Sequence, residues 1–305
     1  MILRRSAAGV LAAAATLMLA ACGQGTQTTT GASTSPTTAA SATAPSSADA
    51  SLAAMVPQAV AEDGVITVGT DSTYAPAEFL DTDGKTIIGF DVDLFDAVAA
   101  RLGLRAQFQS ANFGDIITGV TSGKYEMGVS AFTINPERLK QVTMVSYFSA
   151  GTSWATKSGN PSGISIDNAC GKRVAVQRDT VEVPDITARS AACTKAGKPA
   201  ITIDQYAGQD QATAAVVSGK DDAMLADSPV VAYAVKQTNG QLQLLGAMYD
   251  AAPYGYVVPK DETQLAQAVA RALDALIADG TYRTILDKWG VTPGAVRAAE
   301  VNPAV

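Results

Sequence analysis

An alternation of short β-branched segments with amphipathic segments along the chain narrows the possible folds most. Val65–Gly69 and Ile87–Phe90 predict strands, and Asp91 is expected to cap a helix that Gly103 ends. The apolar residues of that helix fall on one face: Leu94, Phe95, Val98 and Leu102. Near the C-terminal end, Gly280 separates a longer amphipathic helix from a short one. Strands that alternate with helices in this way are typical of an α/β fold.

The two halves of the chain share one sequence pattern. Residues 117–130 and 213–226 each contain a helix end, a Ser-Gly-Lys stop and an acidic residue before a short strand. The pattern predicts the same αβ unit once in each half, although one shared unit can also arise by chance, since glycine often follows a helix. Ligands of open α/β sheets bind beyond the carboxyl ends of the strands. We therefore expect Ser130-Ala131 and Ala226-Asp227 to face a cleft.

The first residues have the features of an export signal. Two arginines precede an apolar run from Ala7 to Ala20, which is too short to span a membrane. The Leu-Ala-Ala-Cys sequence ending at Cys22 is similar to the lipobox of bacterial lipoproteins, in which cleavage leaves a lipidated cysteine. We expect a signal peptide over residues 1–21 and lipidation of Cys22; the alternative is ordinary secretion with an unmodified cysteine.

The segment after the predicted cleavage site differs in composition from the rest. Residues 22–51 are mostly Thr, Ser, Ala, Gly and Pro, so ordering them would cost entropy and bury little apolar surface. They are predicted to be a disordered tether between a membrane and a folded region. The whole chain is 47% hydrophobic, and the roughly 250 residues that follow can bury a large core as one domain or two lobes.

Composition excludes several classes of chemistry. The chain has no histidine, which argues against zinc sites and against Ser-His or Cys-His nucleophilic catalysis. A net charge of −7 disfavours nucleic acid as a partner.

After export, Cys170 and Cys193 would face an oxidising compartment, where a bridge closing a loop of about 24 residues would stabilise the fold by roughly 3 kcal/mol. Two buried free thiols are the alternative. No metal, cofactor or catalytic residue is predicted.

Six motifs follow one another along the chain: VGTDSTY at 68–74, GFDVDL at 89–94, FGDII at 113–117, SAFTINPER at 130–138, DSP at 227–229 and YG at 254–255. This ordered series resembles the bacterial extracellular solute-binding proteins of family 3, the polar amino-acid-binding proteins of ABC importers. The resemblance implies a type II periplasmic-binding-protein-like fold, in which two α/β lobes enclose a ligand cleft and a hinge of two crossing segments joins them. The expected crossings lie near 148–154 and 248–254. The expected bounds are 52–150 with 250–305 for lobe 1 and 151–249 for lobe 2.

The resemblance also assigns the residues that bind the two charged groups of an amino acid. Asn135 and Pro136 predict a helix start, where Arg138 can present its planar fork to a carboxylate. Arg138 is therefore expected to bind the ligand's α-carboxylate, with added hydrogen bonds from Ser130 and Thr133. Asp227 matches the aspartate that receives the α-ammonium, although it could instead be a plain helix N-cap.

Other matched positions concern the ligand's side chain. Tyr74 and Phe113 are expected to enclose its aliphatic part, and Asp71 to reach its distal group, which favours an amide or a cation. Where many relatives have a glycine-containing turn, this chain has VQRDTV at 176–181. Thr180 is expected to donate to the ligand or cap the next helix, and Arg178 either contacts the side chain or pairs with Asp179 at the surface. The predicted ligand-binding set is Asp71, Tyr74, Phe113, Ser130, Ala131, Thr133, Arg138, Gln177, Arg178, Thr180 and Asp227.

The function that the resemblance implies is capture without chemistry. The chain is expected to be the substrate-binding component of an amino-acid ABC importer, which binds a polar L-amino acid by hinge closure and delivers it to a permease with its ATPase. A monomer anchored by lipid on the extracytoplasmic face of the cell membrane is expected. Amide-bearing ligands rank first, basic ones second and acidic ones third. The alternatives are a dehydratase-like enzyme with Glu182 as general acid, and a ligand-sensing or adhesin lipoprotein.

Overall fold

The computed structural model describes residues 48–305. The predicted signal peptide, Cys22 and most of the predicted tether lie outside the described residues. The first helix, α1 (Ala50–Ala53), begins just before the expected end of the tether, because the Asp49 carboxylate accepts hydrogen bonds from the first backbone N–H groups of the helix. None of the helices in residues 48–305 has the length and apolar character that a membrane span requires.

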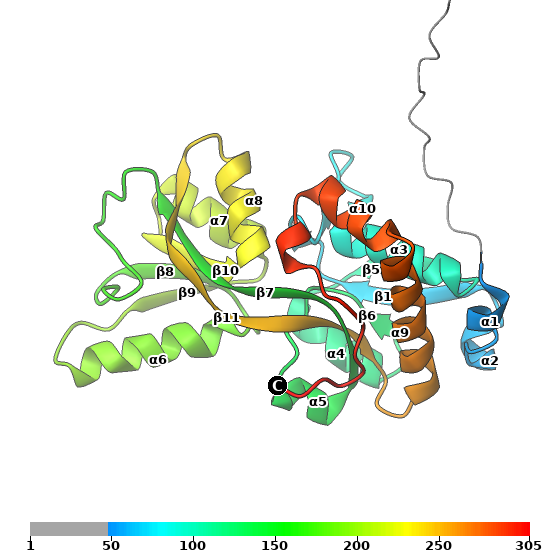
Figure 1. Ribbon diagram of the computed structural model, residues 1–305. Coiled ribbons are helices and arrows are strands. Elements are labelled where there is room, and N and C mark those ends of the chain that lie inside the picture. Colours follow the sequence, from blue (N-terminus) through cyan, green and yellow to red (C-terminus); the bar gives the residue numbers. More distant parts are fainter. Residues whose placement is uncertain (1–47) are drawn as a thin grey trace, which may run out of the picture. The chain divides into compact units, whose positions relative to one another are not determined.

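Eight strands form one mixed sheet in the order β5, β1, β6, β11, β7, β10, β8, β9 (Figure 1). Their bounds are β1 Val65–Thr70, β5 Arg105–Ser110, β6 Met127–Gly128, β7 Thr143–Lys157, β8 Arg173–Gln177, β9 Thr202–Tyr206, β10 Ala223–Asp227 and β11 Leu242–Val258. A second sheet of three short strands joins β2 (Thr73–Tyr74), β3 (Glu78–Leu80) and β4 (Ile87–Ile88).

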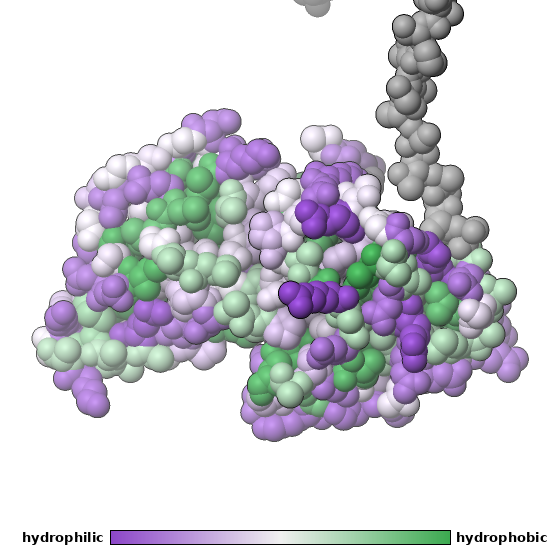
Figure 2. Space-filling model, in the orientation of Figure 1, coloured by the Kyte–Doolittle hydropathy of each residue, from purple (hydrophilic) through white to green (hydrophobic). Residues whose placement is uncertain are grey.

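The helices fall into two groups that define two lobes. Around β1, β5 and β6, lobe 1 contains α2 Gln58–Ala61, α3 Phe90–Arg101, α4 Phe113–Thr121, α5 Pro136–Gln141, α9 Thr263–Ala278, α10 Thr281–Trp289 and the 3-10 turn Thr292–Gly294. Around β8, β9 and β10, lobe 2 contains α6 Glu182–Lys195, α7 Gln209–Ser218 and α8 Ser228–Gln237. Helices α3, α9 and α10 pack on one another in lobe 1, and α6 to α8 pack on the strands of lobe 2. On the face shown in Figure 2, hydrophilic and hydrophobic residues are mixed over both lobes.

The two longest strands belong to both lobes. β7 and β11 run antiparallel over most of their length, and Figure 1 shows them crossing from one lobe to the other. β11 pairs with β6 at Val257 in lobe 1, whereas β7 pairs with β10 from Thr152 onward in lobe 2. The pairing is irregular between Leu245 and Gly255, midway along the ribbon. Both predicted crossing segments lie within these strands.

The repeated αβ unit predicted from the sequence is confirmed. Helix α4 precedes β6, which is parallel to β1, and helix α7 precedes β10, which is parallel to β8. In both units the glycine of the Ser-Gly-Lys stop has a positive φ, +77° at Gly123 and +80° at Gly219. Glycine adopts this left-handed conformation without steric cost, so both helices end where the pattern predicted.

The predicted start of α3 is wrong by two residues. β4 ends at Ile88, Gly89 is the N-cap, and Asp91 lies inside the first turn instead of capping it. The reason is steric: a Cβ at Gly89 would lie 1.9 Å from the Ala77 carbonyl oxygen, so only glycine can start the helix there. Asp91 is then directed into the protein, where it is fully buried.

The largest apolar core joins the two lobes. It extends from α3 and α9 through the central strands to α7 and α8 in lobe 2, while a second core surrounds Trp154 in lobe 2 and a third lies around α4 in lobe 1. At the edge of the second core, a disulfide joins Cys170 to Cys193, with their Cα atoms 5.5 Å apart. The structure thereby selects the bridge over the alternative of two free thiols, and it ties the end of α6 to the loop before β8.

Candidate ligand-binding site

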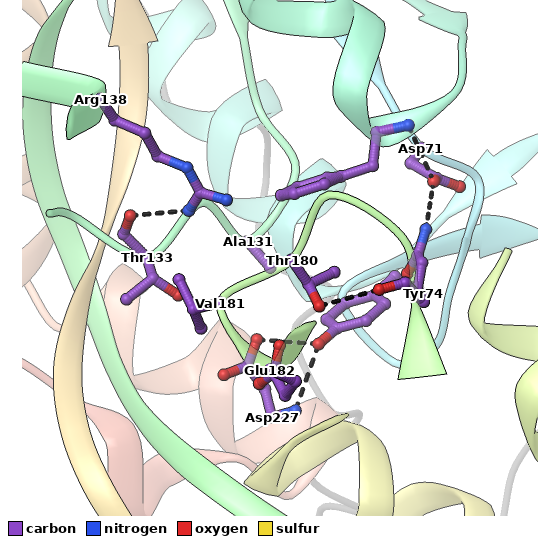
Figure 3. Close-up of a pocket in the computed structure, with 11 residues that line it drawn as sticks. Asp71, Tyr74, Ala131, Thr133, Arg138, Thr180, Val181, Glu182 and Asp227 are labelled. Atoms are coloured by element: carbon purple, nitrogen blue, oxygen red, sulfur yellow. Dashed lines mark hydrogen bonds between the residues drawn. The ribbon is translucent and has the colours of Figure 1, made fainter. Parts of the chain in front are cut away.

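A small pocket lies between the lobes, at the carboxyl ends of the strands (Figure 3). Asp71 follows β1, Gln177 ends β8 and Asp227 ends β10. The pocket thus lies where open α/β sheets bind ligands. Its lining contains nine of the predicted ligand-binding residues and two that were not in that set: Asp71, Tyr74, Phe113, Ala131, Thr133, Arg138, Gln177, Thr180, Val181, Glu182 and Asp227.

Arg138 lies at the start of α5, in the position that the sequence predicted. The Asn135 side chain caps the helix by accepting the Arg138 N–H, and Pro136 occupies the first turn. The guanidinium donates to the Thr133 carbonyl oxygen at 2.7 Å, and only 8% of the residue is exposed. No carboxylate in residues 48–305 forms an ion pair with it. Burial lowers the pKa of Arg138, while the nearby Glu182 and Asp227 charges oppose that shift.

Aromatic rings enclose the pocket beside the guanidinium. Phe113 stacks on Phe132 with their centroids 4.7 Å apart, and the Arg138 guanidinium carbon lies 5.2 Å from the Phe113 centroid. This arrangement holds the guanidinium plane against apolar surface and leaves its outer N–H groups directed to the pocket. Tyr74 contributes a third ring, whose hydroxyl is bonded to lobe 2.

Two carboxyl groups from lobe 2 lie together at the pocket. Asp227 accepts a hydrogen bond from the Tyr74 hydroxyl at 2.8 Å, and Glu182 accepts one from Thr152 at 3.3 Å. Asp227 occupies the N-cap position of α8, yet its side chain makes no capping bond. Burial raises the pKa of Asp227 well above its usual value, and the charge of Glu182 raises it further. Burial also raises the pKa of Glu182.

Asp71 lies on the opposite side of the pocket from Arg138 (Figure 3). Its carboxylate accepts hydrogen bonds from Thr73, from the Phe113 N–H and from the Gln177 side-chain amide, the last at 2.6 Å. Burial raises the pKa of Asp71, and the bonds from Thr73 and Gln177 oppose that shift. The amide oxygen of Gln177 is buried and has no donor among the described residues. This side of the pocket therefore offers acceptors for a donor group.

The turn at 176–181 contains no glycine, and Asp179 supplies its left-handed residue. Asp179 takes the left-handed conformation at φ +66°, which aspartate tolerates better than most residues. The Thr180 hydroxyl donates to the Gln177 carbonyl oxygen at 3.0 Å, and the cap of α6 is Val181 instead of Thr180. Arg178 is exposed outside the pocket lining, with its Nε 3.4 Å from the Tyr206 carbonyl oxygen. No ion pair between Arg178 and Asp179 forms in this part of the chain.

Ser130 is the second predicted residue that does not line the pocket, and it lies buried behind the pocket wall. Its hydroxyl donates to Glu78 at 2.8 Å and accepts the Asp71 N–H at 2.9 Å. Conversely, Val181 and Glu182 line the pocket, although Thr180 is the last residue of this turn in the predicted set. They begin α6 directly after the turn, so extending the turn by two residues would have included them.

Hydrogen bonds across the cleft hold the lobes together. Gln177 bonds to Asp71, Asp227 to Tyr74, and the Gln209 N–H to the Thr73 hydroxyl at 3.2 Å. The Arg138 guanidinium also lies 3.5 Å from the Asp179 carbonyl oxygen. Each of these bonds joins one residue of lobe 1 to one of lobe 2, so the arrangement is closed.

The charges that line the pocket have no counter-ions in the part of the chain that the structure describes. Three carboxyl groups, from Asp71, Glu182 and Asp227, and the guanidinium of Arg138 line it. None of the four forms an ion pair in residues 48–305. Buried charges are costly unless they are paired. Unpaired charges of both signs around one small cavity suit a zwitterionic ligand that brings the missing partners.

Three comparisons place the chain among known proteins. It is 40% identical to the arginine-binding protein ArgT of Corynebacterium glutamicum over 252 residues, which cover 82% of each protein. An ancestral arginine-binding protein solved with arginine matches with a TM-score of 0.68 and 33% identity over 74% of this chain and 98% of that one. The same kind of protein solved with glutamine matches with a TM-score of 0.68 and 32% identity, over 75% and 98% of the two chains.

The sequence profile of one family matches residues 66–292, which include both lobes and every residue of the pocket lining. The fold class predicted from the motifs is confirmed by this match and by the structural neighbours. The chain belongs to the bacterial extracellular solute-binding proteins, family 3, and like them it is an extracytoplasmic binding protein.

Proposed function

We propose that this protein is the substrate-binding component of an amino-acid ABC importer and that its ligand is a basic L-amino acid, with L-arginine first. The observation that carries the proposal is the set of buried, unpaired charges of both signs that both lobes contribute to one pocket. The arginine-binding relatives support the same ligand.

The main-chain groups of an amino acid match one end of the pocket. The guanidinium of Arg138 can bind the α-carboxylate through two parallel N–H groups, since only one of its nitrogens is committed at short distance, to Thr133. Asp227, with Glu182 beside it, can accept the α-ammonium. At this end of the pocket, lobe 1 thus holds the cation and lobe 2 the two carboxyl groups, so a bound zwitterion stabilises the closed arrangement.

Charge at the other end of the pocket favours a basic side chain. With a neutral amide ligand, the three lining carboxyl groups would face the α-ammonium as the only cation of the ligand. A guanidinium or ammonium at the distal end adds a partner for Asp71, and the free amide oxygen of Gln177 can accept a further N–H. We therefore rank basic ligands above the amide-bearing ligands that the sequence put first, and acidic ligands last.

Delivery completes the proposed function. The closed form would dock on a permease whose ATPase powers uptake, with hinge bending in the β7 and β11 ribbon where the pairing is irregular. The lobe bounds would be 52–150 with 250–305 and 151–249. A lipid on Cys22 would hold the protein at the cell membrane, as a monomer tethered by residues 22–51.

Thermal unfolding of the purified protein with each L-amino acid in turn tests the proposal. Ligand at about a hundred times its Kd adds roughly 2.7 kcal/mol to the free energy of unfolding, which raises Tm by about 5–10 °C for a domain of this size. We expect the largest rise with L-arginine. A rise only with acidic or amide amino acids would reject the basic ligand, and no rise with any amino acid would reject the function.

Glu182 gives an enzymatic alternative a specific basis. It is a buried carboxyl group in the pocket, and its raised pKa is the property that a general acid needs. We propose that it serves binding, because the relatives are transporter binding proteins. Incubation with prephenate or arogenate should give no product; formation of product would make the dehydratase the better assignment.

A further inference from the structure

Two carboxyl groups lie buried directly behind the pocket and outside its lining. Glu78 of β3 and Asp91 of α3 are both 0% exposed. The Asp91 N–H donates to the carbonyl oxygen of Ala77, the neighbour of Glu78, at 3.0 Å, and the two side chains bind the consecutive residues Ser130 and Ala131. One oxygen of each, Glu78 Oε2 and Asp91 Oδ1, is buried and has no donor among residues 48–305. Two ionised carboxylates this close would repel each other, whereas a shared proton would satisfy both orphan oxygens.

The surroundings offer no positive charge to either group. No lysine or arginine of the described region forms an ion pair with Glu78 or Asp91, and the chain contains no histidine. The titratable groups that face them are the Tyr147 hydroxyl of β7, which donates to Asp91 Oδ2, Tyr256 of β11, which stacks on Tyr147, and Asp71 beyond Ser130. A proton is therefore the only cation available to the pair.

Each carboxyl group also holds one residue of the loop after β6. Glu78 Oε1 accepts the Ser130 hydroxyl at 2.8 Å, and that hydroxyl in turn accepts the Asp71 N–H at 2.9 Å. Asp91 Oδ2 accepts the Ala131 N–H at 2.9 Å. Ala131 lines the pocket at φ +45°, a left-handed conformation that is strained for alanine and that needs such support.

We propose that Glu78 and Asp91 share one proton and that this acid pair positions the pocket wall, holding Ala131 directly and Asp71 through Ser130. Both are positioning residues, since neither lines the pocket. The positioning role rests on the proposed function, because Asp71 is the group assigned to the ligand's distal cation. The shared proton does not depend on the proposed function.

The direction of the pH effect follows from the pKa shifts. Burial raises the pKa of Glu78 well above its usual value, with a further rise from the Asp91 charge, and burial raises the pKa of Asp91 to about 6. A group with a raised pKa in the folded state holds its proton more tightly there than in the unfolded chain. Its contribution to stability is complete at low pH and is lost as pH rises through the raised value.

Unfolding without any ligand tests the shared proton. Glu78→Gln keeps an acceptor for Ser130 and offers Asp91 an N–H that does not titrate. We expect the Tm of the wild type to fall relative to that of E78Q between pH 5 and 9, by on the order of 2–4 °C. A difference that stays constant with pH would overturn the shared proton.

Titration with L-arginine at pH 7 tests the positioning role. We expect Glu78→Ala and Ser130→Ala to weaken binding about tenfold, and E78Q to stay within about threefold of the wild type. Ser146→Ala is the matched control, because this buried hydroxyl bonds the Glu300 N–H away from the pocket. If E78A does not fold, the affinity of S130A for L-arginine decides whether the pair positions the pocket wall.

The outcomes separate the two proposals. Wild-type affinity in S130A would overturn positioning through Ser130, whatever the unfolding curves show. If L-arginine does not bind the wild type, the proposed function fails and the positioning role with it, while the unfolding comparison with E78Q still decides whether the pair shares a proton.

Discussion

One buried guanidinium carries most of the expected selectivity for an α-carboxylate. Arg138 is 8% exposed and unpaired within the described region. We expect Arg138→Ala to weaken L-arginine binding by about 2–5 kcal/mol while the protein still folds, since the α5 cap bond uses only the Arg138 backbone. Calorimetric titration measures the loss. Exposed Arg178 is the matched control, and R178A should bind like the wild type; equal affinity in both variants would remove Arg138 from the site.

Asp71 should set the preference for the ligand's distal group. In Asp71→Asn the carboxylate becomes an amide of the same shape, so L-arginine should bind about 10- to 100-fold more weakly, whereas L-glutamine should change much less. Competition between the two amino acids reads out the preference directly. Asp261→Asn, at an exposed position with no ion pair in the described chain, is the control. An unchanged arginine-to-glutamine ratio in D71N would contradict this role.

The contrast between Arg138 and Ser130 shows what local sequence can predict about a site. Arg138 was predictable because its helix start is encoded within four residues, by Asn135 and Pro136. The direction of the Ser130 hydroxyl was not, since its partner Glu78 is 52 residues away in sequence. The bond between Gln177 and Asp71 joins residues 106 apart and exists only because the lobes are closed. Distant pairing of this kind leaves no periodic signal in the sequence.

Among the structural elements, α3 depends most on a single backbone position. Gly89 begins this helix at φ +147°, with the Ala77 carbonyl oxygen 1.9 Å from where a Cβ would stand. Gly89→Ala should lower the free energy of unfolding by roughly 3 kcal/mol or more. Chemical denaturation measures it. In the matched control Gly84→Ala, φ is +66° and no atom lies within 4 Å, so only the conformational cost of about 1–2 kcal/mol applies. Equal losses of unfolding free energy in G89A and G84A would show that the protein relieves the clash with Ala77.

The elements themselves were mostly predictable, because each depends on local patterns. The stops at Gly123 and Gly219 follow from backbone freedom, and the strands follow from β-branched runs. The start of α3 was mispredicted because aspartate is a common cap and the steric demand on Gly89 comes from Ala77, twelve positions earlier in the chain. A tertiary contact thus overrode a local preference.

For the molecule as a whole, pH should act in opposite directions on stability and on binding. Burial raises the pKa values of Asp71, Glu182 and Asp227. The protein without added ligand therefore binds more protons when folded than when unfolded, and its free energy of unfolding should fall as pH rises from about 4 through the raised values. A bound cation favours the ionised carboxylates, so the affinity for L-arginine should rise over that same window.

Proton release distinguishes this linkage from a general pH effect on folding. Because L-arginine brings two cations to three carboxyl groups whose pKa values are raised, its binding should expel protons at any pH where those groups are still protonated. Calorimetry in two buffers with different ionisation enthalpies counts those protons. L-glutamine lacks the distal cation, so its binding should release fewer protons. The additional protons released by L-arginine should come from Asp71. In D71N, the two ligands should therefore release the same number of protons. Binding of L-arginine without proton release between pH 5 and 7 would mean that the pocket carboxylates are already ionised before the ligand arrives, and that their burial is offset within the protein itself.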